Sequence, residues 1–157
     1  MKVVVIRKAR EGEAEIMTDL SIRSKKSIGY DDAFMSACQE ELSITEDELH
    51  RGEYWVADFG GICGCACLDV EFNNNFGEVH SFFIDPDMKR QGIGRLLWNE
   101  LVKYAKEKKL RKLILDADPT AVPFYQSLGF KKVKEVSSGS IPGRKIPHMG
   151  YLLGSDH

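Results

Sequence analysis

The stretch DMKRQGIGRLLW, residues 87–98, constrains the fold and function of this chain more than any other. A basic, glycine-punctuated turn runs directly into an apolar stripe at helical spacing, made of Ile93, Leu96, Leu97, Leu101, Tyr104 and Ala105. The first amides of a helix have no internal partner, and the helix dipole makes them attractive to anions. Glycine lets a phosphate approach such amides without meeting a Cβ. The turn therefore predicts a phosphate site, with a solvated helix start as the alternative.

The residues around this turn narrow the kind of phosphate ligand. Lys89, Arg90 and Arg95 flank it and would add charge-assisted contacts. A Walker A loop needs a lysine and then Ser or Thr after its second glycine, whereas Arg95 and Leu96 follow Gly94. A dinucleotide-binding fingerprint needs a third glycine at position 97, which is leucine. Both of these nucleotide motifs are excluded.

Size and charge set the broad class of protein. A chain of 157 residues with 43% hydrophobic content fits one domain over residues 1–157. Its 22 basic and 24 acidic residues give a net charge of −2, which predicts no general attraction to nucleic acid or to an anionic membrane. The apolar part of MKVVVIRKAR is too short for a secretory leader, and no stretch is long enough to span a bilayer. A cytoplasmic location is expected.

Three of the four cysteines, Cys63, Cys65 and Cys67, stand at every second position, which suggests a metal or redox site. On a regular strand such residues share one face, roughly 6–7 Å apart. Thiolates around one zinc each lie about 2.3 Å from the metal, so three such sulfurs fit poorly around one ion. We therefore expect small buried core residues and no metal, with a metal-binding or redox protein as the competing hypothesis.

Hydrophobic periodicity predicts the order of elements. Strands are expected at 2–7, 53–59, 62–72, 78–85 and 111–117, from Phe130, and near the end of the chain, with a turn at 73–75. Helices are expected at 13–24, 31–42, from Thr45 and from Ile93, and near 120–128. Thr45 and Glu48 form a capping-box pattern. Pro123 is compatible with the last helix because it would fall in the first turn.

Two segments, FFIDPDMKRQGIGRLLW and AVPFYQSLGF, resemble the motifs of the GNAT superfamily of acyl-coenzyme A dependent N-acyltransferases. The resemblance implies an α/β (α+β) fold, with a mixed, mostly antiparallel sheet of six to seven strands flanked by about four helices. It implies acetyl-CoA as co-substrate, with pantetheine along a bulged part of strand 78–84. The implied contacts are Phe82, Phe83, Ile84, Lys89, Arg90, Gln91, Gly92, Ile93, Gly94, Arg95, Asp118 and Tyr125.

The chain departs from the family pattern at three of these positions. Lys89 replaces Gln or Arg in the turn, a conservative change because the family uses that residue through its backbone amide. Ile84 takes the usual valine position and should serve equally. Asp118 stands where many members carry asparagine, which puts its contact with the cofactor in doubt.

Proton transfer residues are the next candidates. Tyr125 matches the family tyrosine that protonates the departing thiolate; the alternative is an ordinary half-buried aromatic residue. Glu78 and His80 are general-base candidates because they alternate onto one strand face together with Phe82, although a solvated polar face explains the pattern equally well. His148 and Glu53 are further candidates for this role.

The acceptor is expected to be an amine of a small molecule or peptide. Tyr30, Asp31, Asp32, Phe34 and Trp55 would line its site, or serve only surface and core packing. The sequence thus predicts an N-acetyltransferase acting by direct attack in a ternary complex. The alternative is a non-catalytic acyl-CoA-binding regulatory module. The amine, the preferred acyl group and a homodimer through edge strands stay open.

Overall fold

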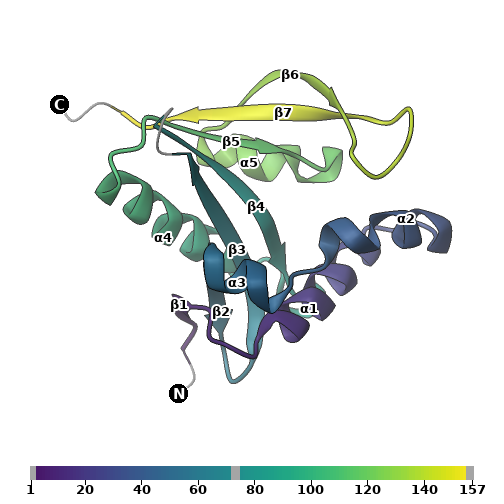
Figure 1. Ribbon diagram of the computed structural model, residues 1–157, viewed down its shortest axis with the longest axis horizontal. Helices are drawn as coiled ribbons and strands as arrows, with labels where there is room; N and C mark the ends of the chain where they lie inside the picture. The colour runs from purple at the N-terminus through teal and green to yellow at the C-terminus, as the bar shows by residue number, and fades with distance from the viewer. Residues whose placement is uncertain (1–2, 72–74, 155–157) are drawn as a thin grey trace.

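The computed structural model describes residues 3–71 and 75–154. The chain forms one mixed sheet of seven strands in the order β1-β2-β3-β4-β5-β7-β6 (Figure 1). The strands are β1 (Val5–Lys8), β2 (Glu53–Asp58), β3 (Ile62–Glu71), β4 (Phe76–Ile84), β5 (Lys112–Asp116), β6 (Lys131–Ser137) and β7 (Lys145–Leu152). Lys2, at the predicted start of the first strand, and most of the predicted turn at 73–75 lie outside the described residues.

All neighbouring strands are antiparallel except β4 and β5. This confirms the expected mixed, mostly antiparallel sheet. A parallel pair requires a crossover, and helix α4 (Ile93–Glu107) supplies it. In such a crossover the helix begins at the carboxyl end of the first strand and returns to the amino end of the second. The start of α4, with its glycine turn, therefore lies at the end of the sheet where β4 finishes.

Within the described residues five α-helices accompany the sheet, where the family resemblance implied about four. They are α1 (Ala14–Lys26), α2 (Asp32–Leu42), α3 (Glu46–Arg51), α4 and α5 (Val122–Leu128). The predicted capping box of Thr45 and Glu48 is present at α3, and Pro123 lies in the first turn of α5, as expected. Along 3–71 and 75–154, no helix is long and apolar enough to cross a bilayer.

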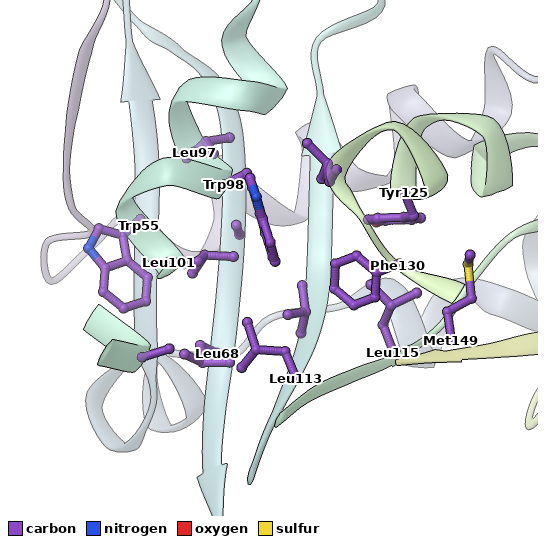
Figure 2. Packing of buried hydrophobic residues seen from close by; sticks show 14 of the residues in the cluster. Trp55, Leu68, Leu97, Trp98, Leu101, Leu113, Leu115, Tyr125, Phe130 and Met149 are labelled. Carbon is purple, nitrogen blue, oxygen red and sulfur yellow. The ribbon is translucent and has the colours of Figure 1, made fainter. Parts of the chain in front are cut away.

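Two apolar clusters hold the helices onto opposite faces of the sheet. The larger one, the α4 cluster, joins α4 and α5 to one face, with Leu101, Leu113, Phe130 and Met149 among its buried members (Figure 2). The smaller one, the α1 cluster, packs α1 against the other face through Met17 and other residues. The two faces of the sheet are therefore covered by different helices, and the side chains of each strand divide between them.

The cysteine row illustrates this division. Ala57 pairs with Gly64 and Asp58 with Ile62, so Cys63 is the extra residue of a β-bulge. Cys63 consequently joins the α4 cluster, whereas Cys65 and Cys67 join the α1 cluster. The expectation that all three thiols share a face is wrong for Cys63, because the bulge reverses the alternation. All four cysteines of the chain are free and buried, as small core residues would be.

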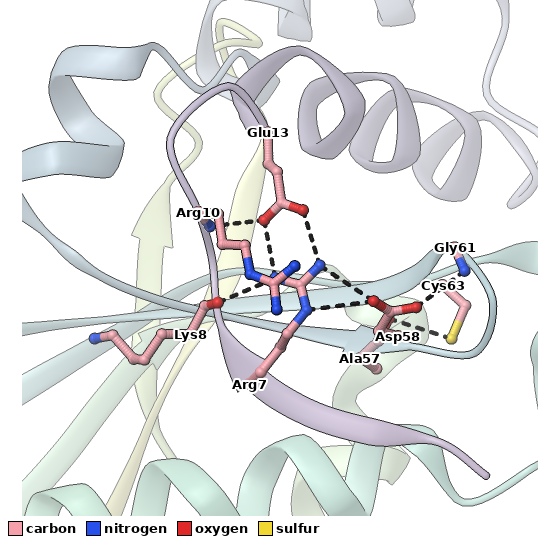
Figure 3. A network of polar contacts seen from close by, with 8 residues as sticks. All are labelled: Arg7, Lys8, Arg10, Glu13, Ala57, Asp58, Gly61 and Cys63. Carbon is pink, nitrogen blue, oxygen red and sulfur yellow. Dashed lines mark hydrogen bonds and ion pairs between the residues drawn. The ribbon is translucent and has the colours of Figure 1, made fainter.

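A charged cluster at the edge of the sheet fixes β1 to the start of α1 (Figure 3). The Arg7 guanidinium donates to both carboxylate oxygens of Glu13, at 3.0 and 2.8 Å, and to Asp58 of β2. Arg7 lowers the pKa of Glu13, although partial burial opposes this shift. Because Arg7 is only 16% exposed, this bidentate pair is better shielded from solvent than an ordinary surface ion pair.

A substitution inside the α4 cluster tests the packing. Leu101 is fully buried, so Leu101→Ala is expected to lower the free energy of unfolding by about 2–5 kcal/mol. Leu96→Ala on the same helix is the matched control, since Leu96 is 41% exposed, and should cost less than about 1 kcal/mol. Urea denaturation measures both. Equal losses for the two variants would contradict the described orientation of α4.

Candidate active site

Strands β4 and β5 stay together over a short distance only. They pair from Phe76–Glu78 to Lys112–Ile114 and then separate (Figure 1). On the other side of β4, Cys67 faces His80 and Cys65 faces Phe83, so Ser81 and Phe82 both stand opposite Ala66. This is a β-bulge, and Ser81 has a left-handed φ of 52°. The strand expected to splay near a bulge therefore does so in the structure.

The bulge changes which face the following residues occupy. Before it, His80 lies edge-on to Tyr54, a member of the α1 cluster. After it, Phe82 packs against the rings of Phe124 and Tyr125 in the α4 cluster. The prediction that Phe82 shares a face with Glu78 and His80 is therefore wrong. The extra residue in the bulge reverses the alternation between His80 and Phe82.

A cleft of about 1100 Å³ opens where β4 and β5 separate. It brings together nearly all the residues proposed from the sequence for catalysis and cofactor binding. Those lining it are Glu78, His80, Phe82, Phe83, Ile84, Lys89, Arg90, Gly92, Ile93, Gly94, Arg95, Asp118 and Tyr125. Gln91 is the one member of that set outside the lining.

The start of α4 forms one end of the cleft. Gly92 has a φ of 78° and precedes the helix, and no side chain of the described residues caps the first amides of α4. Gly94 has a packing role that the sequence did not suggest: an added Cβ would lie 2.9 Å from Cζ of Phe124, so that ring would have to move. Arg90 also takes a left-handed φ, 65°. Uncapped amides and nearby basic side chains make this end suited to an anionic group.

Tyr125 of α5 is a buried side chain that lines the cleft. Burial raises the pKa of its phenol, and the charge of Asp118 acts in the same direction. Among residues 3–71 and 75–154, no group hydrogen-bonds to its hydroxyl, and none of the fully buried side-chain oxygens or nitrogens lacks a partner. The hydroxyl is therefore reachable from the cleft, protonated at neutral pH and available to donate.

Asp118, after β5, is the centre of a shielded polar network. Its Oδ2 accepts from Lys25 at 2.9 Å and from the Tyr30 hydroxyl at 2.8 Å, and lies 3.5 Å from Arg144. Its Oδ1 accepts from the amide and hydroxyl of Thr120. Burial raises the pKa of Asp118, but the hydrogen bonds from these groups outweigh burial and hold it well below 3.8. The carboxylate is thus already occupied by protein partners.

The residues expected to line the acceptor site do not line this cleft. Trp55 is 5% exposed and packs against Tyr104 of α4, so its assignment to the acceptor site is wrong. Asp31 caps α2 by accepting from the amide of Phe34. Tyr30 and Phe34 stack with ring centroids 3.8 Å apart.

Lys25 and Arg144 line the cleft in place of these residues. Their charged groups lie over the rings of Tyr30 and Phe34. Neither residue was predicted from the sequence to line the cleft. They come from a helix end and from a loop, with no motif to connect them.

His80 lines the cleft and forms a polar pair with Asp69, which lies outside the cleft lining. Nε2 of His80 lies 2.5 Å from Oδ2 of Asp69, and Nδ1 lies 3.2 Å from the Ser81 hydroxyl. Burial lowers the pKa of His80, but the hydrogen bond and charge of Asp69 outweigh it and raise the pKa above 6.5. Cys67 donates to the other oxygen of Asp69 at 3.7 Å. Hydrogen bonds to Asp69 thus hold the side chains of Cys67 and His80 close to its carboxylate.

The other base candidates lie outside the cleft lining. His148 pairs with Asp116 at 2.7 Å on β7 and β5, and Glu53 pairs with Lys8. Glu78 does line the cleft and is exposed, next to the last paired residues of β4 and β5. Position therefore favours Glu78 and His80 over His148 and Glu53.

Sequence comparison identifies the family to which this architecture belongs. A profile of the acetyltransferase (GNAT) family matches residues 20–130. The chain belongs to this family. The family predicted from the two motifs is thereby confirmed.

Individual relatives are similar to parts of the chain. An uncharacterised N-acetyltransferase of Methanocaldococcus jannaschii is 35% identical over 80 residues, 49% of this chain and 35% of that protein. Human N-acetyltransferase 8 is 29% identical over 108 residues, 62% of this chain and 48% of that protein. The chain thus spans a third to a half of the length of these curated relatives.

The fold matches at full length. The structure of PaiA N-acetyltransferase from Thermoplasma acidophilum, in complex with coenzyme A, superposes with a TM-score of 0.80 at 18% identity. The match covers 96% of this chain and 99% of that one. This similarity establishes the fold and confirms the expected fold class.

The network around Asp118 predicts a pH-dependent contribution to stability. A carboxyl whose pKa is lower in the folded state stabilises the fold above its unfolded pKa and loses that effect as the pH falls. Asp118→Asn is therefore expected to cost about 2–3 kcal/mol at pH 7, below the ~3–5 of a fully buried pair. The difference in unfolding free energy between this variant and the wild type should shrink only below about pH 3.8. Urea denaturation across pH measures it.

Asp116→Asn serves as the control for this variant. Asp116 ends the same strand and is 42% exposed, and its side chain pairs with His148. Its substitution should cost less than about 1 kcal/mol. A loss as large as that of Asp118→Asn would mean that the strand end, not the network, determines the effect.

Proposed function

We propose that the chain transfers an acetyl group from acetyl-CoA to an amine of a small molecule or peptide, by direct attack in a ternary complex. The observation that carries the proposal is the meeting of two features in one cleft. The uncapped, glycine-led start of α4 forms one end of it, and the Tyr125 hydroxyl lies in its wall. Membership of the acetyltransferase (GNAT) family supports this interpretation.

The residues at the start of α4 fit the pyrophosphate of coenzyme A. The first-turn amides carry no side-chain cap, and Lys89, Arg90 and Arg95 line the same end of the cleft. Farther along, Phe82, Phe83 and Ile84 line the stretch of β4 that β5 leaves without a partner. Unpaired strand backbone suits the amides of a pantetheine arm. When bound, acetyl-CoA supplies an activated thioester carbonyl.

Two protons must move during the transfer. The amine nitrogen attacks the carbonyl carbon, the C–N bond forms and the C–S bond breaks. Tyr125 donates its proton to the departing thiolate, and a base on β4, His80 or Glu78, takes the proton of the amine. Tyr125 belongs to the α4 face and His80 contacts the α1 face. Both residues line the cleft that opens where β4 and β5 separate, which supports their action on one substrate.

Removing the Tyr125 hydroxyl tests the acid. Tyr125→Phe is expected to lower kcat by about 10²–10⁴-fold, the usual contribution of general acid catalysis, while acetyl-CoA affinity changes little. Thiol release with a panel of amines measures turnover, and calorimetry measures acetyl-CoA binding. Unchanged turnover would show that Tyr125 does not act as the acid.

The anion site is tested by a strain-matched pair of glycines. Gly92→Val places a β-branched residue at φ 78°, which distorts the turn and should weaken acetyl-CoA binding at least about 10-fold, since such residues avoid this region. Gly12→Val imposes similar strain at φ 90°, away from the cleft, and should leave binding unchanged. Equal losses of affinity in both variants would argue against a site at α4.

The same assays separate the proposal from its alternative. Acetyl-CoA that raises the melting temperature, without thiol release for any amine, would indicate a non-catalytic acyl-CoA-binding module. Release with one class of amine would establish catalysis and identify the acceptor class together.

A further inference from the structure

The environment of His80 defines which of its nitrogens is free to act. An ionised carboxylate accepts hydrogen bonds and cannot donate them. Oδ2 of Asp69 lies 2.5 Å from Nε2 of His80, so Nε2 must carry the proton of the neutral ring. The lone pair is then on Nδ1, which lies 3.2 Å from the Ser81 hydroxyl. Ser81 is the bulge residue of β4 and lines the cleft.

From this geometry we infer that Asp69 is a positioning residue for acetyl transfer. It holds His80 in the Nε2–H tautomer, so that Nδ1 faces Ser81 and the cleft as the proton acceptor. This inference rests on the proposed function and deepens it, because it selects His80 over Glu78 as the base. The amine proton goes to Nδ1, directly or through the Ser81 hydroxyl, and the resulting imidazolium keeps its Nε2–H bond to the Asp69 carboxylate.

Three contacts keep the pair in place. Asp69 accepts a second hydrogen bond from Cys67, whose sulfur is buried in the α1 cluster. His80 is directly opposite Cys67 across β3 and β4. The ring of Tyr54 packs edge-on against the imidazole, with centroids 6.1 Å apart and an interplanar angle of 85°. A base whose ring is restrained on two sides loses less freedom on reaching the transition state.

The charges around His80 determine the direction of its pH dependence. Asp69 of β3, Glu78 of β4 and Glu48 of α3 each favour the protonated ring, while burial against Tyr54 and Cys67 disfavours it. The neutral ring is the base, so activity should rise with pH through the pKa of His80. Removing the Asp69 charge should move this rising limb to lower pH.

Asp69→Asn tests the inference by kinetics. We expect kcat/KM on the plateau to fall roughly 10- to 100-fold, less than the ~10²–10⁴ of a whole general-base step, and the acidic limb to shift to lower pH. Asp69→Glu should restore part of the activity. Asp19→Asn, an equal change of charge at an exposed position of α1, should alter neither. A loss at all pH values with an unmoved limb would overturn the positioning role.

Nitrogen-15 NMR of the four histidines tests the tautomer without any substrate. The His80 signals, assigned with His80→Gln, should show a protonated Nε2 and a bare Nδ1 in the neutral ring. In Asp69→Asn the pKa of His80 should fall and the signals of His148 should stay unchanged. The opposite tautomer, or an unchanged pKa, would overturn the inference.

The two experiments separate this inference from the proposed function. If wild-type protein releases thiol with an amine but the limb of Asp69→Asn stays fixed, only the role of Asp69 fails. If wild-type protein acetylates no amine of the panel, the proposed function fails and the catalytic role of Asp69 fails with it, whatever tautomer the NMR shows.

Discussion

The short parallel contact between β4 and β5 is the constraint on which the rest of the site depends. A parallel pair cannot be closed by a hairpin, so the chain must cross over, and α4 is that crossover. The crossover places the first turn of α4 beside the carboxyl end of β4, where the two strands have already separated. One topological requirement thus places unpaired strand backbone, a helix N-terminus and a cleft at the same point.

The bulge at Ser81 adds a second constraint. Without it, His80 and Phe82 would share a face, and the aromatic contacts of Phe82 with Phe124 and Tyr125 would not form. With it, the base candidate His80 stays on the α1 side, while Phe82 and Ile84 lie on the α4 side. A left-handed serine is unfavourable on its own, and the pairing of β3 with β4 on either side of it holds the backbone in this conformation.

The parts of the fold that have local signals were predictable from the sequence. The α4 stripe (apart from the exposed Leu96), the capping box at Thr45 and the place of Pro123 in the first turn of α5 all depend on neighbours within one or two turns. The bulge at Cys63 was not predicted, and a bulge in strand 78–84 was expected only from the family resemblance, without its position, because bulges depend on the register between strands. The faces predicted from strand alternation were therefore wrong at Cys63, which is itself an extra residue, and at Phe82, which follows one.

Side chains that meet only through the tertiary fold were likewise missed. Asp69 and His80 are cross-strand neighbours, and Lys25, Asp118 and Arg144 come from three distant segments. Asp118 itself had a signal, since its departure from the family asparagine marked a changed role. In the structure its carboxylate accepts from Lys25 and from the Tyr30 hydroxyl and lies 3.5 Å from Arg144.

The polar network around Asp118 also limits how this chain can diverge. Lys25 and Tyr30 both donate to Oδ2 of Asp118, and Arg144 donates to the Tyr30 hydroxyl. The effect of replacing any one of them therefore depends on which partners remain. A replacement tolerated in one background would then be harmful in another. Substitutions along this wall of the cleft should accordingly become established in pairs or in a fixed order, and chimaeras that exchange α1 without the segment before β7 would combine incompatible halves.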